Sequence, residues 1–452
     1  MIKFHKNSTA VAGFSLATAL FLTACSDSGD TDANNTDASN GAPAEAVTIE
    51  FWHSASGASA DIIRQLVEEF NAENDVNATV NEIYQGSYQD AIASLTNAVG
   101  TVDLPDVMQV TDTSTGFMYD SGLVTPIADL AEGEMADNIE DLVPIIDQYY
   151  TYDDKLQAMP FQVSMPVIYA NDSLLEEAGL STDNGPETVE ELTEWAQTIK
   201  DSTGTAGLTL GLNSYWLEVM TSSAGELYCT PDNGLGGEPA DAVNYSSDAQ
   251  ISQWTNMQEI IESEALLNVG QQGSEAQNAF GSETAGMLMA SSGNLGNVSS
   301  MLPDGFTVYP CPIDHGDGGL APSGNALWVI GQDKDDTQQS AAAAFVQFMG
   351  SPESQAKIFA ATGYLPNSTA AIELARPEAS PQATVILDQL ESAEGSFITG
   401  GCHSGAMASL RSDAAQPAID AIAAGNDVKA TLESAEAEGS EVIARYNERA
   451  GL

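Results

Sequence analysis

Arg411 is the first residue of this chain whose type and surroundings suggest chemistry. It lies in HSGAMASLRSDA, residues 403 to 414, and is one of five arginines in 452 residues with a formal net charge of −54. A guanidinium keeps its charge when buried and offers a rigid fork of N–H donors that matches phosphate or carboxylate. Arg411 therefore predicts an anionic partner, which is either a bound ligand or a carboxylate of the chain in a structural ion pair.

The residue types that usually perform catalysis form no recognisable set. The four histidines are scattered without a zinc-binding pair, and they are His5, His53, His315 and His403. Cys402 and His403 are adjacent, and neighbours in sequence rarely meet as nucleophile and base. There is no GxSxG, Walker A or GxGxxG motif, which argues against a serine hydrolase, an NTPase and a dinucleotide enzyme. We therefore expect no enzyme, no metal and no cofactor, and we interpret DHGDGG (314–319) as an acidic turn rather than a calcium loop.

The charge balance excludes some partners. With 66 acidic residues against 12 basic ones, nucleic acid and anionic lipid surfaces are poor partners, because binding them requires clustered Lys and Arg. Solubility is the simplest explanation of this acidity.

The N-terminus predicts export. Lys3 and Lys6 precede an apolar run over residues 10–22, which is typical of a secretory signal and too short for a stable membrane span. The run ends in LTAC (22–25), which resembles the lipobox of bacterial lipoproteins; the alternative is an ordinary signal with a chance cysteine. We expect residues 1–24 to be a signal peptide, Cys25 to be lipidated, and the small and acidic residues up to 46 to form a flexible tether. The protein would then be membrane-anchored, either in the periplasm or at the cell surface.

Three further cysteines remain after Cys25. Cys229, Cys311 and Cys402 allow three pairings in an exported protein, and the sequence does not choose among them.

Hydrophobic periodicity predicts an α/β protein. From residue 47 the order is strand, helix, strand, helix, strand, which implies right-handed crossovers and a mostly parallel sheet covered by helices on both faces. The segments are VTIEFW (47–52), SADIIRQLVEEFNAEN (59–74), VNATVNEIY (76–84), YQDAIASLTNAVG (88–100) and DVMQV (106–110). Helical patterns recur later, and FQVSMPVIYA (161–170) and NALWVIGQ (325–332) are isolated strand-like runs. The length suggests two or three units, and no short internal repeat is present.

Several of these segments together resemble a known family. TIEFWHSASG, EEFNAEN, YQGSYQDAI, FQVSMPVIYAND, MASSGN, ALWVIGQDK and ATGYLPNSTAA occur in this order. The series is similar to the extracellular solute-binding proteins of ABC importers, in the class that includes the maltose-binding type, and it most resembles the receptors for sn-glycerol 3-phosphate. The resemblance runs from Val47 to about Arg449. It implies a periplasmic-binding-protein-like fold, in which two α/β lobes joined by a multi-strand hinge hold the ligand in the cleft between them.

The resemblance also implies a set of ligand-binding residues. Tyr88 and Tyr364 match tyrosines that face phosphate, Asp112 takes the position of a glutamate suited to glycerol hydroxyls, and Arg411 takes that of the phosphate-binding arginine. Ser164 and Ser291 match two serines, and Gly324 matches a glycine that lets a backbone amide approach the ligand. Trp52 and Trp216 are possible cleft aromatics, although such residues more often belong to the core. Residues 209–234 depart from the family pattern around Tyr215 and Cys229, so the walls at the non-phosphate end of the ligand are left open.

The family also implies lobes built from discontinuous segments. We expect lobe I to comprise 47–163 and 324–370, and lobe II to comprise 164–323 and 371–452. The expected function is capture of sn-glycerol 3-phosphate or a glycerophosphodiester by a monomer that delivers it to membrane permease subunits. The alternatives are a receptor for a neutral oligosaccharide and, in another class, an exported hydrolase or an adhesive lipoprotein.

Overall fold

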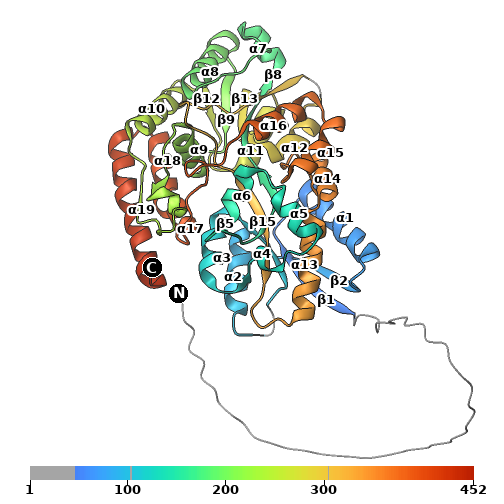
Figure 1. Ribbon diagram of the computed structural model, residues 1–452. Coiled ribbons are helices and arrows are strands. Elements are labelled where there is room, and N and C mark those ends of the chain that lie inside the picture. The colour runs from blue at the N-terminus through green and yellow to red at the C-terminus, as the bar shows by residue number, and fades with distance from the viewer. Residues whose placement is uncertain (1–45, 102–103, 304) are drawn as a thin grey trace, which may run out of the picture.

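The computed structural model describes residues 46–101, 104–303 and 305–452. The expected signal peptide, the lipidation site Cys25 and the tether up to residue 45 lie outside the described residues. The remaining chain forms two lobes, each built around its own sheet. Figure 1 shows β8, β9, β12 and β13 in the upper half of the molecule and β1, β2 and β15 in the lower half.

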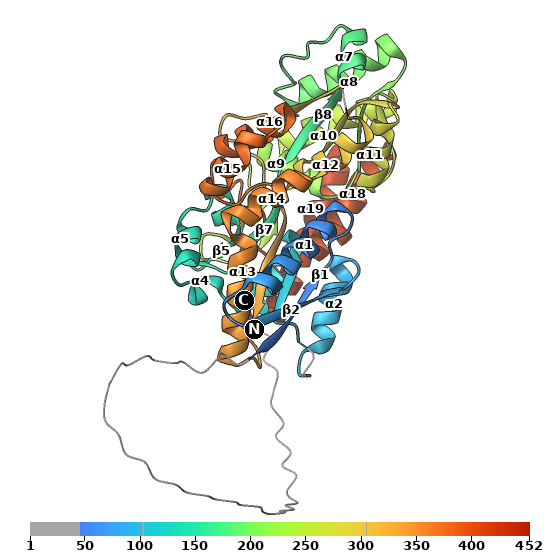
Figure 2. The same cartoon turned by 90° about the vertical axis from the view of Figure 1, so that its right-hand side faces the viewer.

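The first sheet has the order β2-β1-β3-β15-β4, and β7 also pairs with β15. Its strands are β1 (Val47–His53), β2 (Ala78–Tyr84), β3 (Val107–Thr111), β4 (Val124–Thr125), β7 (Met159–Ser164) and β15 (Ser323–Ile330). Helix α1 (Ala58–Glu73) buries one apolar stripe, which consists of Ile62, Ile63, Leu66, Val67 and Phe70. Helix α13 (Asp336–Gly350) packs against β1, β7 and β15, and α14 (Pro352–Thr362) packs against α1, as Figure 2 shows. Both helices are therefore part of the lower lobe although they lie late in the sequence.

The second sheet has the order β12-β9-β13-β8-β14. Its strands are β8 (Pro166–Asn171), β9 (Ala206–Leu210), β12 (Leu266–Asn268), β13 (Ala285–Ser291) and β14 (Phe306–Pro310). Helices α8 (Val189–Thr203), α10 (Asp248–Glu262), α11 (Gly273–Gly281) and α16 (Pro381–Ser392) pack around it. Strands β8 and β9, which lie on either side of the central strand β13, are buried along their whole length, which is why they appear in the sequence as continuous apolar runs rather than alternating ones.

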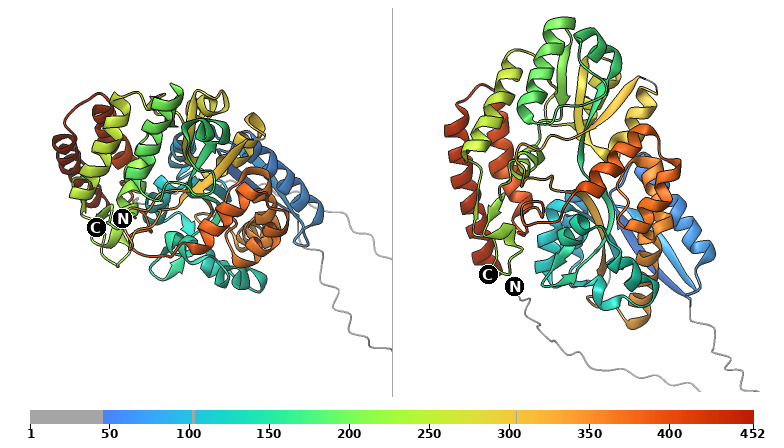
Figure 3. Two further views of the ribbon diagram at one scale, coloured as in Figure 1. Left: turned by 90° about the horizontal axis from the view of Figure 1, so that it is seen from above. Right: turned by 45° about the horizontal axis from the view of Figure 1, so that its top comes forward.

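The C-terminal helices connect the two lobes along one side. Helices α18 (Gln416–Ala423) and α19 (Val428–Ala450) pack against α10 of the upper lobe. Figure 3 shows α19 running down beside the lower lobe to the C-terminus. There Tyr446 on α19 donates a 2.6 Å hydrogen bond to Asp120 on α3 (Thr115–Ser121). The end of the chain thus spans the junction between the lobes.

The prediction of a mostly parallel sheet is right for only part of the lower lobe. β1 pairs in parallel with β2 and β3, as the strand–helix order requires. β15 pairs antiparallel with β3, β4 and β7 because it returns from the upper lobe instead of through a local helical crossover. Pairing between segments so distant in sequence leaves no local signal, so periodicity alone could not reveal it.

The run at 161–170 is two strands rather than one. Strand β7 of the first sheet ends at Ser164, and strand β8 of the second sheet begins at Pro166. Every residue of both strands is buried, so the apolar run continues while the chain passes from one lobe to the other. A connection this short keeps the two sheets close at the level of Ser164.

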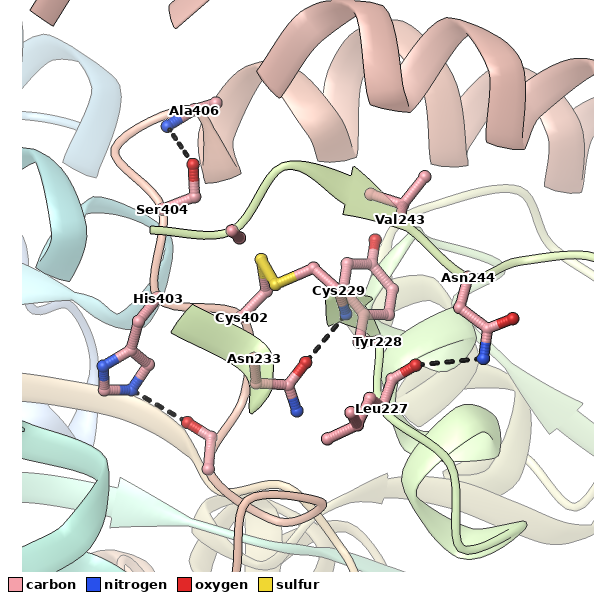
Figure 4. The surroundings of a disulfide bond; sticks show 12 residues. Leu227, Tyr228, Cys229, Asn233, Val243, Asn244, Cys402, His403, Ser404 and Ala406 are labelled. Atoms are coloured by element: carbon pink, nitrogen blue, oxygen red, sulfur yellow. Dashed lines mark hydrogen bonds between the residues drawn. A yellow bond between two sulfur atoms is a disulfide. The ribbon is translucent and has the colours of Figure 1, made fainter. Parts of the chain in front are cut away.

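A disulfide joins Cys229 to Cys402 across a separation of 173 residues, and Cys311 is a buried free thiol. The pairing that the sequence left open is therefore settled for the described residues. Figure 4 shows Asn233 beside the bond, where its side-chain oxygen accepts from the Cys229 amide at 2.7 Å. Its backbone carbonyl accepts from the His403 amide at 2.8 Å. The loop after α9 (Tyr215–Ser223) is thereby tied to the segment that leads to Arg411.

Removing this disulfide is expected to lower the stability of the protein. A crosslink across so long a loop restricts the unfolded chain, and its loss should lower the free energy of unfolding by about 4 kcal/mol. The measurement is chemical denaturation of the double variant Cys229→Ala/Cys402→Ala. Cys311→Ala is the control, since it removes a thiol without opening a crosslink and should cost only about 1 kcal/mol. Equal losses in the two variants would contradict the expectation.

Candidate functional site

A cavity of about 260 Å³ lies between the two sheets. Six of the residues predicted from the sequence line it, and they are Tyr88, Ser164, Trp216, Ser291, Gly324 and Tyr364. Ser164 and Gly324 come from strands of the first sheet, whereas Ser291 ends β13 of the second sheet. The cavity therefore has walls from both lobes. Its lining contains hydroxyls, amides and aromatic rings and no Asp, Glu, Lys, Arg or His among the described residues.

Tyr88 is the first residue of helix α2 (Tyr88–Ala98) and is held there by the helix cap. Ser87 and Asp90 form a reciprocal capping box, which fixes the start of the helix. The Tyr88 hydroxyl oxygen accepts a hydrogen bond from Asn325 Nδ2 at 3.1 Å, so its own proton is left to donate to a ligand. Burial raises the pKa of Tyr88, and the phenol is a neutral donor.

A buried network of amides orients Asn325 beneath the cavity. Gln109 Nε2 donates to Asn325 Oδ1 at 3.0 Å and to Gln162 Oε1 at 3.1 Å. Gln109 Oε1 in turn accepts from the Ser54 amide at 3.0 Å, and Ser59 donates to Gln162 at 2.8 Å. Side chains from β3, β7 and β15 are therefore joined by hydrogen bonds, which restrict the conformation of Asn325 in the cavity wall.

Gly324 has a structural reason to be glycine. Its φ is +117°, and a Cβ at this position would lie 2.1 Å from the carbonyl oxygen of Gln162. A side chain would therefore force β15 away from β7, in addition to filling the cavity wall. The register of the two strands shifts one residue further on, between Asn325 and Ala326.

Ser291 and Tyr364 form the upper rim together. The Ser291 hydroxyl accepts from the Gly293 amide at 3.1 Å, which caps the short turn that follows β13. The ring of Tyr364 lies so close to Gly293 that a Cβ there would be 2.8 Å from Tyr364 Cε1. No other described residue forms a hydrogen bond with the Tyr364 hydroxyl, and burial raises its pKa. Tyr364 is thus a neutral phenol held at the cavity wall by packing.

Arg411 lies one side chain behind the cavity wall and is part of an ion cluster. Its Nε donates to Glu218 Oε1 at 2.5 Å and its Nη2 to Glu218 Oε2 at 3.0 Å. The same Nη2 donates to Asp112 Oδ2 at 2.7 Å. The Arg411 side chain is 16% exposed and each carboxylate 3%. Tyr215 lines the cavity, and its ring centroid lies 5.5 Å from Arg411 Cζ.

The local backbone gives Arg411 an unusual position. Leu410–Ala415 form a π-helical turn between α17 (Met407–Ser409) and α18. Such turns insert one residue into a helix, shift the following side chains, and are frequent at functional sites. The disulfide at Cys402 and the Asn233 bond to His403 fix the chain just before this turn. The neutral His403 is part of that support, since burial lowers its pKa to about 3.

The surroundings of the cluster favour the charged form of Arg411 and oppose the charged form of Glu218. Burial opposes the charge of Arg411, but Asp112 and Glu218 outweigh it and raise the pKa of the guanidinium. Burial raises the pKa of Glu218, and Arg411 only partly offsets this. Asp112 is held by further donors, because Thr111 donates to Oδ1 at 2.7 Å and Ser323 to Oδ2 at 3.3 Å.

Three predicted residues lie off the cavity lining. Arg411 and Asp112 are not among the lining residues and pair with each other. This pairing is compatible with Arg411 as a ligand-binding residue and with Arg411 as a structural ion-pair partner. Trp52 is 7% exposed in β1 and belongs to the core.

Sequence reasoning missed Asn325, Tyr215 and Glu218. Glu218 has a local signal, since it is the only charged residue in the apolar helix YWLEVMTSS. With 66 acidic residues in the chain, that signal was easily lost. Asn325 has none, because its importance depends on pairing with Gln109 and Tyr88 across the sheet.

Other features of the described residues lie away from the predicted binding residues. No group of three or more His, Cys, Asp and Glu in the described ranges could hold a metal ion. A larger groove of about 1120 Å³ is lined mainly by residues 182–187, 307–320 and 385–399, and none of the predicted binding residues lines it.

The sequence is similar to glycerol-phosphate receptors of bacteria. It is 29% identical over 386 residues to the sn-glycerol-3-phosphate-binding periplasmic protein UgpB of Escherichia coli, covering 82% of this chain and 86% of the relative. It is also 29% identical over 337 residues to UgpB of Rhizobium meliloti, covering 73% and 77% of the two chains.

Solved structures share the fold. UgpB from Mycobacterium tuberculosis in complex with glycerophosphocholine superimposes with a TM-score of 0.71 at 21% identity, over 88% of this chain and 98% of that one. The GacH receptor of Streptomyces glaucescens, solved unliganded and with acarbose, gives 0.74 at 20% identity over 89% and 99%. These likenesses show the two-lobed fold of periplasmic solute-binding proteins.

The family model of the bacterial extracellular solute-binding proteins matches residues 65–385. This span covers most of both sheets and the cavity between them. The chain belongs to the bacterial extracellular solute-binding protein family.

Proposed function

We propose that this protein is the substrate-binding lipoprotein of an ABC importer and captures sn-glycerol 3-phosphate or a glycerophosphodiester for delivery to membrane permease subunits. One observation carries the proposal: a cavity between the lobes is lined by residues from both that match the phosphate-ester receptors, with Arg411 beside Tyr215 of its wall. The identity with two UgpB proteins supports the same ligand class. Both relatives are named as binding proteins, which supports a receptor rather than an enzyme.

The proposed binding mode uses neutral donors and one cation. Tyr88 and Tyr364 offer phenolic protons, and Ser164 and Ser291 offer hydroxyls at the cavity wall. Arg411 Nη1 forms no hydrogen bond with any described residue, because Glu218 and Asp112 occupy only Nε and Nη2. We assign this remaining edge to the anionic group of the ligand. Asp112 would accept from a glycerol hydroxyl, and Trp216 would cover the apolar face of the ligand.

The proposed lobes follow the sheets except at Ser164 and Ser323, the terminal residues of β7 and β15. We infer that lobe I comprises 47–163 and 324–370 and that lobe II comprises 164–323 and 371–452. The passage from β7 to β8 beside Ser164 and the return through β15 support these boundaries. Closure of the lobes would exclude water, so each hydrogen bond to the ligand would count for more. We expect a monomer.

A second candidate is a receptor for a neutral oligosaccharide. It is favoured by the absence of charged residues from the described cavity lining and by the two carboxylates that already neutralise Arg411. In that case Arg411 would be a structural ion-pair partner, as the sequence also allowed. The two candidates differ in what they require of Arg411.

Calorimetric titration distinguishes the two. The purified protein is titrated with sn-glycerol 3-phosphate, glycerophosphocholine and maltose, beside Arg411→Ala. We expect a phosphate ester to bind with micromolar or tighter affinity and Arg411→Ala to weaken it by at least about 100-fold, because a charge-assisted fork is lost. Thermal melting without ligand separates loss of binding from loss of fold. Binding of maltose alone, or an ester affinity that survives Arg411→Ala, would contradict the proposal.

The membrane anchor is a separate part of the proposal. Cys25 in LTAC supports lipidation, and the extracellular character of the family agrees with export. Among the described residues no helix is both long and apolar enough to cross a membrane. Cys25→Ser should therefore move the protein from the membrane fraction to the soluble fraction of the cell envelope. Cys311→Ser is the control and should remain membrane-bound; an unchanged distribution of Cys25→Ser would refute the anchor.

A further inference from the structure

Glu218 holds one whole edge of the Arg411 guanidinium. The two glutamate oxygens accept from Nε and Nη2 at 2.5 and 3.0 Å, which is the parallel fork typical of arginine and carboxylate. Since a guanidinium can only donate, both oxygens must accept, and Glu218 is ionised in this arrangement. The fork prevents rotation of the guanidinium and leaves Nη1 as its one edge without a partner among the described residues.

The cluster has one negative charge more than it has positive charges. Arg411 is its single cation, and Asp112 supplies the second carboxylate at 2.7 Å. The other titratable groups that interact electrostatically with Glu218 are the tyrosines Tyr149, Tyr215, Tyr228 and Tyr245. Burial raises the pKa of each of them, so all four are uncharged at neutral pH. No described lysine, arginine or histidine lines the cavity to compensate for the excess.

The excess negative charge of the cluster affects which ligand charge the cavity can accept. We propose that Glu218 is a positioning and charge-selecting residue, which orients Arg411 and makes the receptor favour a phosphate ester with one negative charge over one with two. The inference rests on the proposed function and adds a choice within it. A phosphodiester has one negative charge at its phosphate, whereas a phosphomonoester has two above its second pKa of about 6.

The physical reason is uncompensated repulsion in a partly dry site. The first charge of the ligand is met by Nη1 of Arg411 and by neutral donors. A second charge would face the excess negative charge of the cluster at short range, where solvent screens it poorly. The overall charge of −54 adds to this repulsion. We expect the receptor to favour the singly charged ester by about tenfold or more at pH 7.5.

The first test compares two ligands that differ in this charge. The intact protein is titrated calorimetrically with sn-glycerol 3-phosphate and with its methyl phosphodiester, which lacks a second ionisation and carries no cationic group. At pH 7.5 the diester should bind more tightly by about tenfold or more. At pH 5.5 the monoester is mostly singly charged, and its disadvantage should largely disappear. Because burial raises the pKa of Glu218, protonation of this residue acts on both esters. The ratio of the two affinities therefore reports the charge of the ligand.

The second test changes Glu218 itself. Glu218→Gln removes the excess charge while Asp112 still pairs with Arg411, so the diester preference at pH 7.5 should fall by about tenfold. Glu218→Asp keeps the charge and shortens the fork, so it should weaken both esters and keep the preference. Glu177→Gln, on an exposed position of the same lobe, makes the same change in net charge and should alter neither affinity. Circular dichroism checks that each variant is folded.

The outcomes are distinct. A diester preference that disappears at low pH and in Glu218→Gln supports the inference. Equal binding of the two esters at pH 7.5, or an unchanged preference in folded Glu218→Gln, overturns it while ester binding and the proposed function remain. If Glu218→Gln does not fold, the ratio at the two pH values in the unmodified protein decides. If neither ester binds, the proposed function itself fails.

Discussion

The buried pairing of Arg411 with Asp112 and Glu218 is the interaction on which the two-lobed site depends. Its three members come from the end of β3, from α9 and from the π-helical turn after Met407, so they bring together chain segments separated by 299 and 193 residues. Removing these charges from water is costly, and only close and complete pairing offsets that cost. The geometry therefore tolerates little displacement of any partner. This requirement explains why a disulfide and the Asn233 bonds fix the chain immediately before Arg411.

The cavity and the ion cluster divide the work of recognition. The described cavity wall supplies aromatic rings together with hydroxyls and amides, which can form hydrogen bonds with a polar ligand without adding charge to the site. The amide network of Gln109, Gln162 and Asn325 keeps these donors in place before a ligand arrives. The charged groups lie beside Tyr215 and off the described cavity lining, and two carboxylates occupy Nε and Nη2 of Arg411. In the proposed binding mode, shape and hydrogen bonding belong to the cavity, and charge selection belongs to the cluster.

The sequence predicted most local elements because their signals are local. The stripe from Ile62 to Phe70 requires only a helix against a core, and α1 forms over almost the predicted residues. The antiparallel place of β15 and the division of the run at Ser164 depend on partners from distant segments, which periodicity cannot reveal. The site shows the same division. Ordered family resemblance found five residues of the cavity wall and the aromatic argument found Trp216, whereas Glu218 and Asn325 act through contacts made only in three dimensions.

The scarcity of cations makes their locations informative. Most of the lysines and arginines in described ion pairs are well exposed, for example Lys155 at 50% and Arg64 at 53%, where solvent and salt weaken the attraction. Lys334 and Arg411 are the least exposed cations in these pairs at 10% and 16%, and each is paired with a buried aspartate. Lys334 joins the start of β3 to the end of β15 through Asp106 and the Leu104 carbonyl. Of these two, only Arg411 lies beside the cavity between the lobes. A phosphate ester approaching this protein is repelled at long range, and beyond about 10 Å that repulsion is largely screened in 0.1 M salt. Affinity must therefore come from contacts inside the cleft, where a single well-supported arginine can decide the outcome.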